Sequence, residues 1–349
     1  MKDGYFHRVS ARYQNRLWVN NPTSEEADRA IEAGAIGCTT NPAFASKMLR
    51  SPLQCGKALQ IAGEAAAETG DNHRAVARVQ QRLVKDLSEK FMPLYEENPG
   101  KAGFVSIQGD PNAEEDFRHI LGEAMENIKL NPNIIAKIPV TEAGLEAIRY
   151  LLAENVPVIA TEIMGVSQAI AACELHRDVA AATGKAPPFF VTHITGIFDQ
   201  YLEAWALREG IDISGEALAQ AGCAIARKQY ALLAQRGYPV TMLGGGARDT
   251  RHFTEMVGSG VHVTLNWSGM ADKLIEDDPP VLDRMTAQMP GQGIMELLDK
   301  LPDFRKAYRE DGMKIEEFMD FGPVKFFRDM FVKGWDQLLN TVQECRRGG

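Results

Sequence analysis

A lysine interrupts an apolar run that is typical of a buried strand. Within Ile134–Pro139, Lys137 stands among isoleucine and alanine residues. Successive side chains of a strand alternate between its two faces, so we expect Lys137 to share a face with Ile135 and to point away from Ala136 and Ile138. Burial would disfavour the ammonium form and leave a free amine, which can attack a carbonyl carbon and form a Schiff base. The strand alone leaves open the alternative of a strand-end lysine held in a salt bridge.

Hydroxyl and amide groups close a second apolar run. The run that begins at Ala35 ends in Thr39, Thr40 and Asn41. These side chains could hydrogen-bond to the hydroxyl groups of a small polar substrate. The same residues also fit an ordinary helix start, in which Asn41 caps the helix and Pro42 takes its first position.

A glycine-rich turn follows another apolar run. Gly244, Gly245 and Gly246 precede Ala247 and Arg248. Backbone N–H groups of such a turn, together with the Arg248 guanidinium, could bind a phosphate group. The alternative is a plain surface turn in which Arg248 pairs with the aspartate that follows it.

Other polar residues at the ends of apolar runs are further candidates. They are Gln108, Thr161, His193 and Asn266. The imidazole of His193 has a suitable pKa range for moving protons near neutral pH, although a lone histidine is more often structural. The cysteines and histidines are scattered without the spacings of disulfide frameworks or metal sites, so we expect no metal ion.

Short strand-like runs alternate with Ala-rich helical segments as far as about residue 265, which is the alternation expected of βαβ units around a parallel sheet. Eight such repeats favour an α/β fold of the closed (β/α)8 TIM barrel type, because closure leaves no exposed sheet edge. In such a barrel the active site lies at the carboxyl ends of the strands, where the polar candidates stand. The predicted strands are Arg16–Asn20, Ala35–Thr40, Gly103–Gln108, Ile134–Ile138, Pro157–Thr161, Phe189–Ile194, Pro239–Leu243 and Val261–Leu265.

The C-terminal part of the chain contains no strand-like run. Apolar residues recur at helical spacing in Ile294–Leu301 and Val324–Leu339, and extra helices also fit between the second and third predicted strands. We expect one domain over residues 1–349, with the barrel at about 16–276 and a helical extension at about 277–345. The aromatic residues of the extension should cover the barrel of their own chain. A homodimer is an alternative that the sequence leaves open.

Composition narrows the classes of function. The chain has 38 basic and 47 acidic side chains, a net charge of -9, and no run of lysine and arginine. Nucleic-acid surfaces need basic side chains that replace condensed counterions, so we expect no nucleic-acid partner. The N-terminal segment 1–8 has no apolar stretch of the signal-peptide kind, and no uncharged apolar run is long enough to span a bilayer. We expect a cytoplasmic protein without a membrane partner that acts on a small molecule.

The segments around Asn41 and Lys137 together resemble two motifs of the transaldolase family. GCTTNP at 37–42 is similar to that family's second-strand motif, and AKIPVTEAGL at 136–145 is similar to the motif of its Schiff-base lysine on the fourth strand. LWVNN at 17–21 resembles the family's first strand, and the tail at 325–339 resembles the closing helix of its longer bacterial branch. The resemblance covers nearly the whole chain.

This resemblance implies a (β/α)8 barrel without metal or organic cofactor, in which Lys137 forms an imine with a ketose, either a sugar or a sugar phosphate. Cleavage would release an aldehyde and leave a dihydroxyacetone unit on the lysine. A transaldolase, an enzyme of the pentose phosphate pathway, passes that unit to a second aldehyde, whereas an aldolase releases it to water. Asn41 would bind the keto-sugar, Thr161 would position catalytic water, and Arg248, beside Gly246, would bind the phosphate.

Several positions depart from the family's pattern. Its first-strand aspartate, a general acid–base, falls on Asn20, and its third-strand glutamate falls on Gln108. Losing both carboxylates removes acid–base catalysis that is worth about 10²–10⁴-fold. Phe190 stands where the small fructose 6-phosphate aldolase branch uses a tyrosine to contact substrate, and His193 replaces a second phosphate-binding arginine.

Another group must therefore move protons if the chain is an enzyme of ordinary rate. We take His193 as the best candidate because of its pKa range. Glu162 and Asp110 also lie near strand ends, but alternation would turn Glu162 away from the side of Thr161.

Two readings of function follow. The first is a class I enzyme of the transaldolase kind, a transferase or, on a non-standard substrate, an aldolase-type lyase. The second is a sugar-binding pseudoenzyme with the same barrel. Asn20 and Gln108 favour the second reading, whereas the intact segments around Lys137 and Asn41 favour the first.

Overall fold

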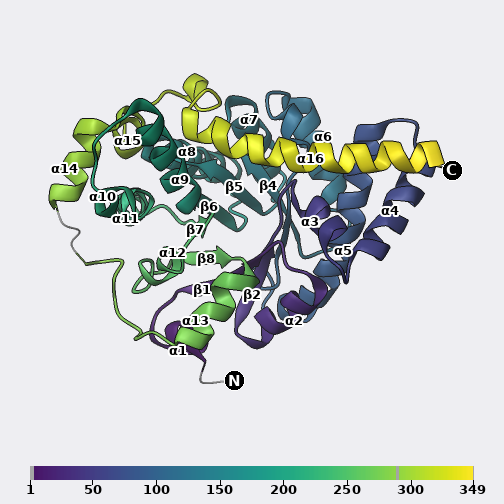
Figure 1. Ribbon diagram of the computed structural model, residues 1–349, viewed down its shortest axis with the longest axis horizontal. Coiled ribbons are helices and arrows are strands. Elements are labelled where there is room, and N and C mark those ends of the chain that lie inside the picture. Colours follow the sequence, from purple (N-terminus) through teal and green to yellow (C-terminus); the bar gives the residue numbers. More distant parts are fainter. Residues whose placement is uncertain (1–3, 288–290, 349) are drawn as a thin grey trace.

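The computed structural model describes residues 4–287 and 291–348, so the first three residues of the N-terminal segment lie outside it. Within the described residues, eight parallel strands close a barrel in chain order, and helices surround it (Figure 1). This confirms the predicted (β/α)8 fold. The strands are β1 (Arg16–Asn20), β2 (Ala35–Thr39), β3 (Val105–Ile107), β4 (Ile134–Pro139), β5 (Val158–Ile163), β6 (Phe189–Ile194), β7 (Thr241–Gly245) and β8 (His262–Leu265).

Predicted and observed strands differ mainly at their ends. β7 begins at Thr241 rather than at Pro239, because proline has no N–H to donate to a sheet. β5 runs on to Ile163, past its predicted end at Thr161, and its register against β6 shifts between Ala160 and Ile163. This irregularity changes which side chains of β5 face the site.

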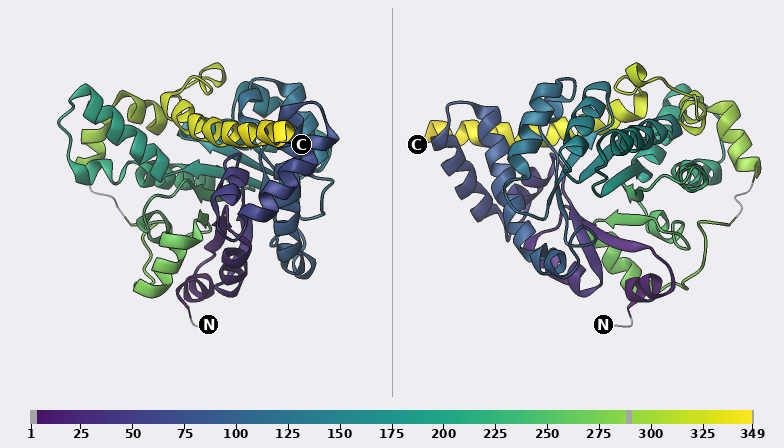
Figure 2. Two further views of the ribbon diagram at one scale, coloured as in Figure 1. Left: turned by 45° about the vertical axis from the view of Figure 1, so that its right-hand side comes forward. Right: turned by 180° about the vertical axis from the view of Figure 1, so that it is seen from behind.

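The helices pack around the barrel, and the last three lie in the part of the chain that was predicted to be a helical C-terminal extension (Figure 2). Both segments predicted there, 294–301 and 324–339, are helical. Three helices fill the long connection between β2 and β3, as expected. The helices are α1 (Tyr5–Arg12), α2 (Ser24–Glu32), α3 (Phe44–Arg50), α4 (Cys55–Glu68), α5 (Asn72–Glu97), α6 (Phe117–Asn127), α7 (Glu142–Ala153), α8 (Val166–Thr183), α9 (Gly196–Glu209), α10 (Gly215–Leu218), α11 (Ala221–Gln235), α12 (Arg251–Thr254), α13 (Asp272–Asp277), α14 (Gly291–Lys300), α15 (Pro302–Tyr308) and α16 (Gly322–Gly348).

Alternation along the strands sorts the barrel interior into layers. An apolar plug fills the lower layer with Trp18, Phe104, Ile135, Ile159, Phe190 and Leu243. The residue two positions further along a strand faces the same way. One step toward the carboxyl ends, the interior therefore presents Asn20, Ser106, Lys137, Thr161, Thr192 and Gly245. A polar layer thus rests on an apolar one.

Gly37 makes room for the largest side chain of the plug. A Cβ atom at this position would lie 2.7 Å from the indole ring of Trp18, which is fully buried. We therefore expect Gly37→Ala to destabilise the protein by about 1–3 kcal/mol, the usual cost of overpacking a core. Urea unfolding measures the change. Gly63→Ala on α4 is the control, because a Cβ there meets nothing within 4 Å and should stabilise the helix by about 0.5–1 kcal/mol; equal effects of the two changes would contradict the expectation.

The extension is held against its own barrel by α16, the long yellow helix in Figures 1 and 2, which contacts α3, α4, α5 and α9. Phe327, Phe331 and Trp335 are buried, and Phe326 is partly buried against the same core. This confirms the predicted role of the tail aromatics. Across residues 4–287 and 291–348, no helix combines the length and the hydropathy needed to cross a bilayer.

Candidate active site

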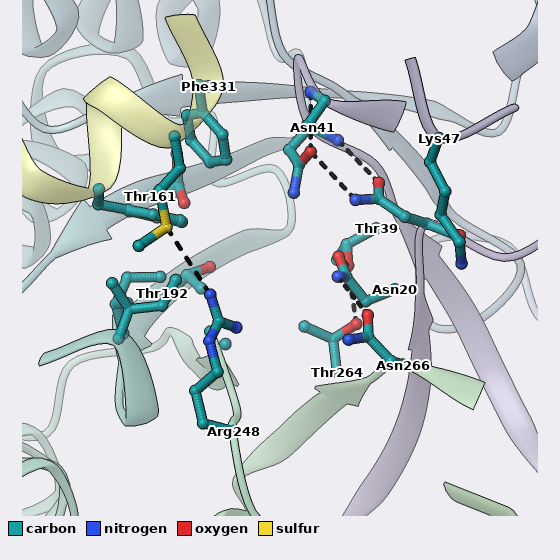
Figure 3. A pocket seen from close by; sticks show the side chains of 18 of the residues that line it. Asn20, Thr39, Asn41, Lys47, Thr161, Thr192, Arg248, Thr264, Asn266 and Phe331 are labelled. Carbon is teal, nitrogen blue, oxygen red and sulfur yellow. Dashed lines mark hydrogen bonds between the residues drawn. The ribbon is translucent and has the colours of Figure 1, made fainter. Parts of the chain in front are cut away.

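A cavity of about 580 Å³ opens at the carboxyl ends of the barrel strands (Figure 3). Polar side chains of the strands and of the loops after them form its walls, and Phe327, Met330 and Phe331 of α16 cover one side. This is the position at which TIM barrels bind substrates. Residues predicted from the sequence that line it are Asn20, Thr39, Asn41, Lys137, Thr161, Gly245, Gly246, Arg248 and Asn266.

Lys137 lies inside the barrel at the floor of this cavity. Its side chain shares the face of Ile135, as alternation predicted, and the residue is only 6% exposed. The Nζ atom donates a hydrogen bond to the carbonyl oxygen of Thr40 (3.3 Å) and lies 5.8 Å from the centre of the Phe331 ring. In the described part of the chain, Lys137 forms no salt bridge, so the alternative of a strand-end ion pair does not apply.

Burial lowers the pKa of Lys137 to about 8, from an ordinary value of 10.5. The carboxyl groups of Glu162 and Glu114 act in the opposite direction and keep the pKa from falling further. A fraction of the lysine is therefore a free amine near neutral pH. A buried amine of this kind can attack a carbonyl carbon.

Asn20 is held in place by a network on the opposite side of the cavity. Its Nδ2 atom donates to Asn266 Oδ1 (2.9 Å), and its Oδ1 atom accepts from Thr39 Oγ1 (3.0 Å). Thr39 in turn contacts Thr264 through their hydroxyl groups (2.7 Å). Figure 3 shows these side chains grouped at the ends of β1, β2 and β8. The network offers amide and hydroxyl groups to a polar ligand, but no carboxylate.

Asn41 lines the cavity, and its side chain is held by the turn that precedes α3. Its Oδ1 atom accepts from the backbone N–H of Ala43 (3.0 Å) and from Asn21 Nδ2 (3.0 Å). This fixes the amide, and its Nδ2 atom has no acceptor among the described residues. The predicted helix start was wrong, because α3 begins at Phe44 with Ala43 as its N-cap. The Asn41 amide is fixed in the turn before this helix and lines the cavity, as the other interpretation expected.

Arg248 supplies positive charge on the side facing β6 and β7. Its Nε atom donates to Gln200 Oε1 (2.8 Å), and Nη2 lies 3.8 Å from Met330 Sδ (Figure 3). No carboxylate of the described residues pairs with this guanidinium, and burial lowers its pKa. Two other cations of the wall already have partners: Lys47 pairs with Glu26 (3.2 Å), and Arg50 donates to Gln337. The Arg248 guanidinium therefore has no anionic partner among the described residues and can bind an anion.

The loop that presents Arg248 is fixed by a buried histidine. His252 Nδ1 accepts from the backbone N–H groups of Arg248 and Asp249, at 3.1 Å each, and its Nε2 atom bonds to Asp199 Oδ2 (2.9 Å). Gly196 lets α9 pack closely against this loop, because a Cβ atom at position 196 would lie 2.6 Å from the backbone nitrogen of Arg248. The glycine turn is therefore more than a plain surface turn.

Two threonine hydroxyl groups in the wall have no partner among the described residues. They belong to Thr161 on β5 and Thr192 on β6, and both oxygen atoms are buried. A buried hydroxyl without a partner costs free energy unless a ligand or water bonds to it. Both groups are thus available to a bound substrate or water molecule.

Behind Lys137 lies a pair of buried glutamates that the sequence interpretation did not place in the site. Gln108 Nε2 donates to Glu162 Oε1 (2.8 Å) and to Glu114 Oε1 (3.3 Å). Burial raises the pKa of both carboxyl groups, and each also interacts with the other. Arg328 of α16 lies 3.6 Å from Glu114. We call Glu114 and Glu162 the glutamate pair.

Strict alternation failed at Glu162 because the backbone there is left-handed. Glu162 has a φ of 62°, next to the register shift of β5, so Thr161 faces the main cavity while Glu162 reaches Gln108. Few residues other than glycine adopt such a φ, and it is costly. No pattern of residue types in the sequence signals this turn.

Four predicted site residues do not line the main cavity. Phe190 belongs to the apolar plug below it. Thr40 acts through its carbonyl oxygen on Lys137, while its hydroxyl donates to Ser106. Gln108 lines a smaller cavity behind the lysine. His193 faces outward, where its Nε2 atom bonds to the carbonyl oxygen of Gly222 (2.9 Å).

The expectation that His193 moves protons in the site therefore needs correction. Its neighbour Thr192 faces the cavity, so alternation turns His193 toward α11. Burial lowers its pKa to about 4. The imidazole is thus neutral at physiological pH and lies outside the cavity.

Comparison with known proteins agrees with this architecture. The family model described as Transaldolase/Fructose-6-phosphate aldolase matches residues 17–305. A protein of Mycobacterium tuberculosis (strain ATCC 25618 / H37Rv) named Transaldolase is 31% identical over 208 residues, which span 56% of this chain and 54% of that protein. The matched region is thus about half the length of that relative. A Transaldolase of Saccharopolyspora erythraea is 26% identical over 367 residues, which span 91% of this chain and 90% of that protein.

A third relative, the Transaldolase of Mycobacterium leprae (strain TN), is 26% identical over 345 residues, which span 88% of this chain and 86% of that protein. The family match includes all eight strands except the first residue of β1. It therefore contains Lys137, both members of the glutamate pair and Arg248. The chain belongs to the transaldolase/fructose-6-phosphate aldolase family.

Proposed function

We propose that this chain is a transaldolase-like enzyme that forms a Schiff base between Lys137 and a ketose, and then transfers or releases a dihydroxyacetone unit. The observation that supports this most directly is the position of Lys137, a buried amine with a lowered pKa that lines a polar cavity at the carboxyl end of the barrel. Family membership supports the same reaction class.

The cavity offers a group for each part of such a substrate. The Asn41 amide and the Asn20 network would bind the hydroxyl groups of the sugar, and the Thr161 hydroxyl would hold the water that enters or leaves at the imine. Arg248 would bind a phosphate at the far end of the chain. A free guanidinium that forms charge-assisted bonds suits a phosphorylated ketose better than a neutral one.

Once the imine has formed, its protonated nitrogen draws electrons from the substrate chain. The carbon–carbon bond beyond the adjacent hydroxyl-bearing carbon then breaks while the hydroxyl group on its far carbon gives its proton to water. That carbon leaves as an aldehyde, and the electron pair of the broken bond stays on the dihydroxyacetone unit attached to Lys137. Attack of this unit on a second aldehyde completes transfer, whereas hydrolysis of the imine completes an aldolase cycle.

Borohydride trapping tests the proposal. The protein is incubated separately with fructose 6-phosphate and with dihydroxyacetone, reduced, and analysed by intact mass and peptide mapping. We expect an adduct on Lys137 and none on Lys47, the other lysine of the cavity wall. No adduct with either compound, in protein that is folded by circular dichroism, would refute the proposal and favour a sugar-binding pseudoenzyme, the reading that the amides of Asn20 and Gln108 support.

Arg248 gives a prediction about the substrate. We expect Arg248→Gln to raise KM for fructose 6-phosphate by roughly 10–100-fold, because a lost charged hydrogen bond costs about 1.5–3 kcal/mol. Trapping of dihydroxyacetone, which has no phosphate, should be unaffected and serves as the internal control. An equal loss with both compounds would mean that Arg248 supports the structure of the cavity rather than binding phosphate.

A further inference from the structure

We infer that the glutamate pair, Glu114 and Glu162, takes a proton from Lys137 and returns it to the hydroxyl group that leaves when the imine forms. The inference rests on the proposed function, and deepens it by naming the acid–base group of the imine step. The amide at Gln108, where a carboxylate was expected from the family, then becomes the group that holds the pair together.

The contacts around Gln108 support a shared proton. One amide nitrogen bridges both carboxyl groups, with Gln108 Nε2 at 2.8 Å from Glu162 and 3.3 Å from Glu114. Both carboxyl groups thus contact the same nitrogen atom, and each acts on the pKa of the other. Two buried carboxylates held by one amide nitrogen cannot both ionise at low cost, which raises their pKa values and favours a pair that shares one proton and carries one negative charge.

Only two cations balance that charge among the described residues that face the pair. Lys137 comes from β4, and Arg328 comes from α16, 3.6 Å from Glu114. Arg328 is fixed by its bond to the carbonyl oxygen of Pro111 (2.9 Å), and an arginine does not release its proton. Lys137 is thus the partner with which the pair can exchange a proton.

A small cavity links the pair to the lysine. It measures about 20 Å³, and its polar lining includes Gln108, Asp110, Glu114, Glu123 and Lys137. Glu114 is the member of the pair that borders it, and Glu162 reaches it only through Gln108. Lys137 also lines the main cavity. The volume is enough for one water molecule, which needs two to four polar partners. Glu114 Oε2 and Gln108 Oε1 are buried without a hydrogen bond from any described residue. These atoms would bond a water that relays the proton.

Protons and charges balance over the whole of imine formation. The Lys137 ammonium first gives one proton to the pair, which becomes neutral. The nitrogen lone pair then attacks the ketose carbonyl carbon, the carbon–oxygen π bond breaks, and a nitrogen proton moves to the oxygen to give a carbinolamine. Finally the carbon–oxygen bond breaks, the hydroxyl leaves as water with the proton from the pair, and the nitrogen lone pair forms the carbon–nitrogen double bond. The product is a protonated imine beside a singly charged pair, as at the start.

Backbone strain at Glu162 supports a functional role. The left-handed φ of 62° puts this glutamate, rather than Thr161 or Ile163, next to Gln108. A non-glycine residue in this region costs about 1–3 kcal/mol, and a buried carboxyl group adds a further cost. A purely structural site would be more stable with an apolar side chain.

The test measures the rate at which the imine forms. Parent, Glu162→Gln and Glu114→Gln are mixed with fructose 6-phosphate, and samples are reduced with borohydride at increasing times before peptide mapping. We expect the trapping rate to fall by about 10²-fold or more in each variant, the scale of lost acid–base catalysis, with the adduct still on Lys137. Glu154→Gln, an exposed glutamate at the end of α7, is the control and should trap at the parent rate.

The pH profile separates proton transfer from a structural role. In the double variant Glu114→Gln/Glu162→Gln, Lys137 loses the negative charge of the pair, which raises its pKa, so the acid limb of the trapping profile should move below pH 8 even as the maximum rate falls. Loss of rate without this movement would overturn the inference, because a distorted site would lower the rate at every pH. So would variants that trap as fast as the parent.

The outcomes remain distinct from those of the proposed function. A parent that forms no adduct refutes the function itself, whereas a parent that traps while the glutamine variants match its rate refutes only the role of the pair. If one variant fails to fold, the other still tests the role of the pair, because Glu162 lies on β5 and Glu114 lies in the loop after β3. The exchange Gln108→Glu/Glu162→Gln gives a third readout: it keeps two carboxyl groups and one amide, and should recover trapping that Gln108→Glu alone loses.

Discussion

Lys137→Met is expected to abolish borohydride trapping and to lower turnover of the ketose by at least about 10⁴-fold, the scale on which loss of a covalent nucleophile acts. Methionine has a similar length and fits among Ile135 and Phe331 without a charge. Intact-mass analysis after reduction and a coupled assay for the released aldehyde measure the two effects.

The same variant carries its own control for folding. The pKa of Lys137 is about 8 in the folded protein, whereas its ordinary value of 10.5 applies in the unfolded chain. Between pH 8 and pH 10.5 the unfolded chain therefore binds more protons than the folded protein. The free energy of unfolding of the parent should therefore rise with pH from about 8 to 10.5 through this group. Lys137→Met should remain folded and lack that rise, which urea titrations at several pH values would detect.

A different result would change the assignment. If Lys137→Met still formed a reducible adduct, for instance on Lys47, the nucleophile would be misassigned. If the variant kept its activity without any adduct, the reaction would not pass through an imine. Either outcome would reject the role of Lys137 while leaving the family membership intact.

The fold followed from the sequence because its signals are local and repeated. Each strand is a short apolar run, and β1 and β6 have the bounds that were predicted. The predicted strand ends were wrong at two kinds of place. At Pro239 the backbone lacks an N–H group for the sheet, and at the end of β5 the register against β6 shifts. The division of the chain into barrel and extension stays a prediction.

The candidate site was predictable to the extent that it depends on alternation. Lys137, Asn20 and Thr161 face the cavity because each stands two positions after a plug residue. The same rule shows that His193 faces away, once its neighbour Thr192 is recognised as a cavity residue. The sequence did not predict Glu162 as a site residue because its left-handed backbone breaks the alternation of side chains. It did not predict Glu114 because this residue lies in a loop whose path depends on the packing of α16.

The two amides that depart from the family's pattern have different consequences. Gln108 lies beside the glutamate pair, which in the proposed mechanism replaces the missing carboxylate and supplies an acid–base group for imine formation. Asn20 is surrounded by Thr39, Thr264 and Asn266, which supply hydroxyl and amide groups only. In the proposed reaction, bond cleavage needs a base on the substrate hydroxyl near this wall. The one carboxylate among the described residues that line the cavity is Glu26, which already bonds to Lys47 and Ser268. The geometry favours a site that forms imines faster than it cleaves them.

Asn20→Asp is accordingly expected to raise the rate of aldehyde release from fructose 6-phosphate by about 10²–10⁴-fold, the usual contribution of a general base, while the rate of borohydride trapping stays the same. The carboxylate fits, because Thr39 already donates to this position and the Asn266 amide can turn to donate as well. Single-turnover release of aldehyde, measured beside trapping, separates the two steps.

Asn266→Asp is the matched control for that experiment. It adds the same negative charge to the same network, and the new carboxylate can still accept the hydrogen bond from Asn20 Nδ2. The carboxylate then lies at position 266 on the β8 side of the network, and position 20 keeps its amide. A gain with Asn20→Asp and not with Asn266→Asp would show that a base at the end of β1 limits cleavage. Equal rates in both variants and the parent would mean that the amide at this position is not limiting, and that the chain acts on a ketose whose cleavage does not need a base there.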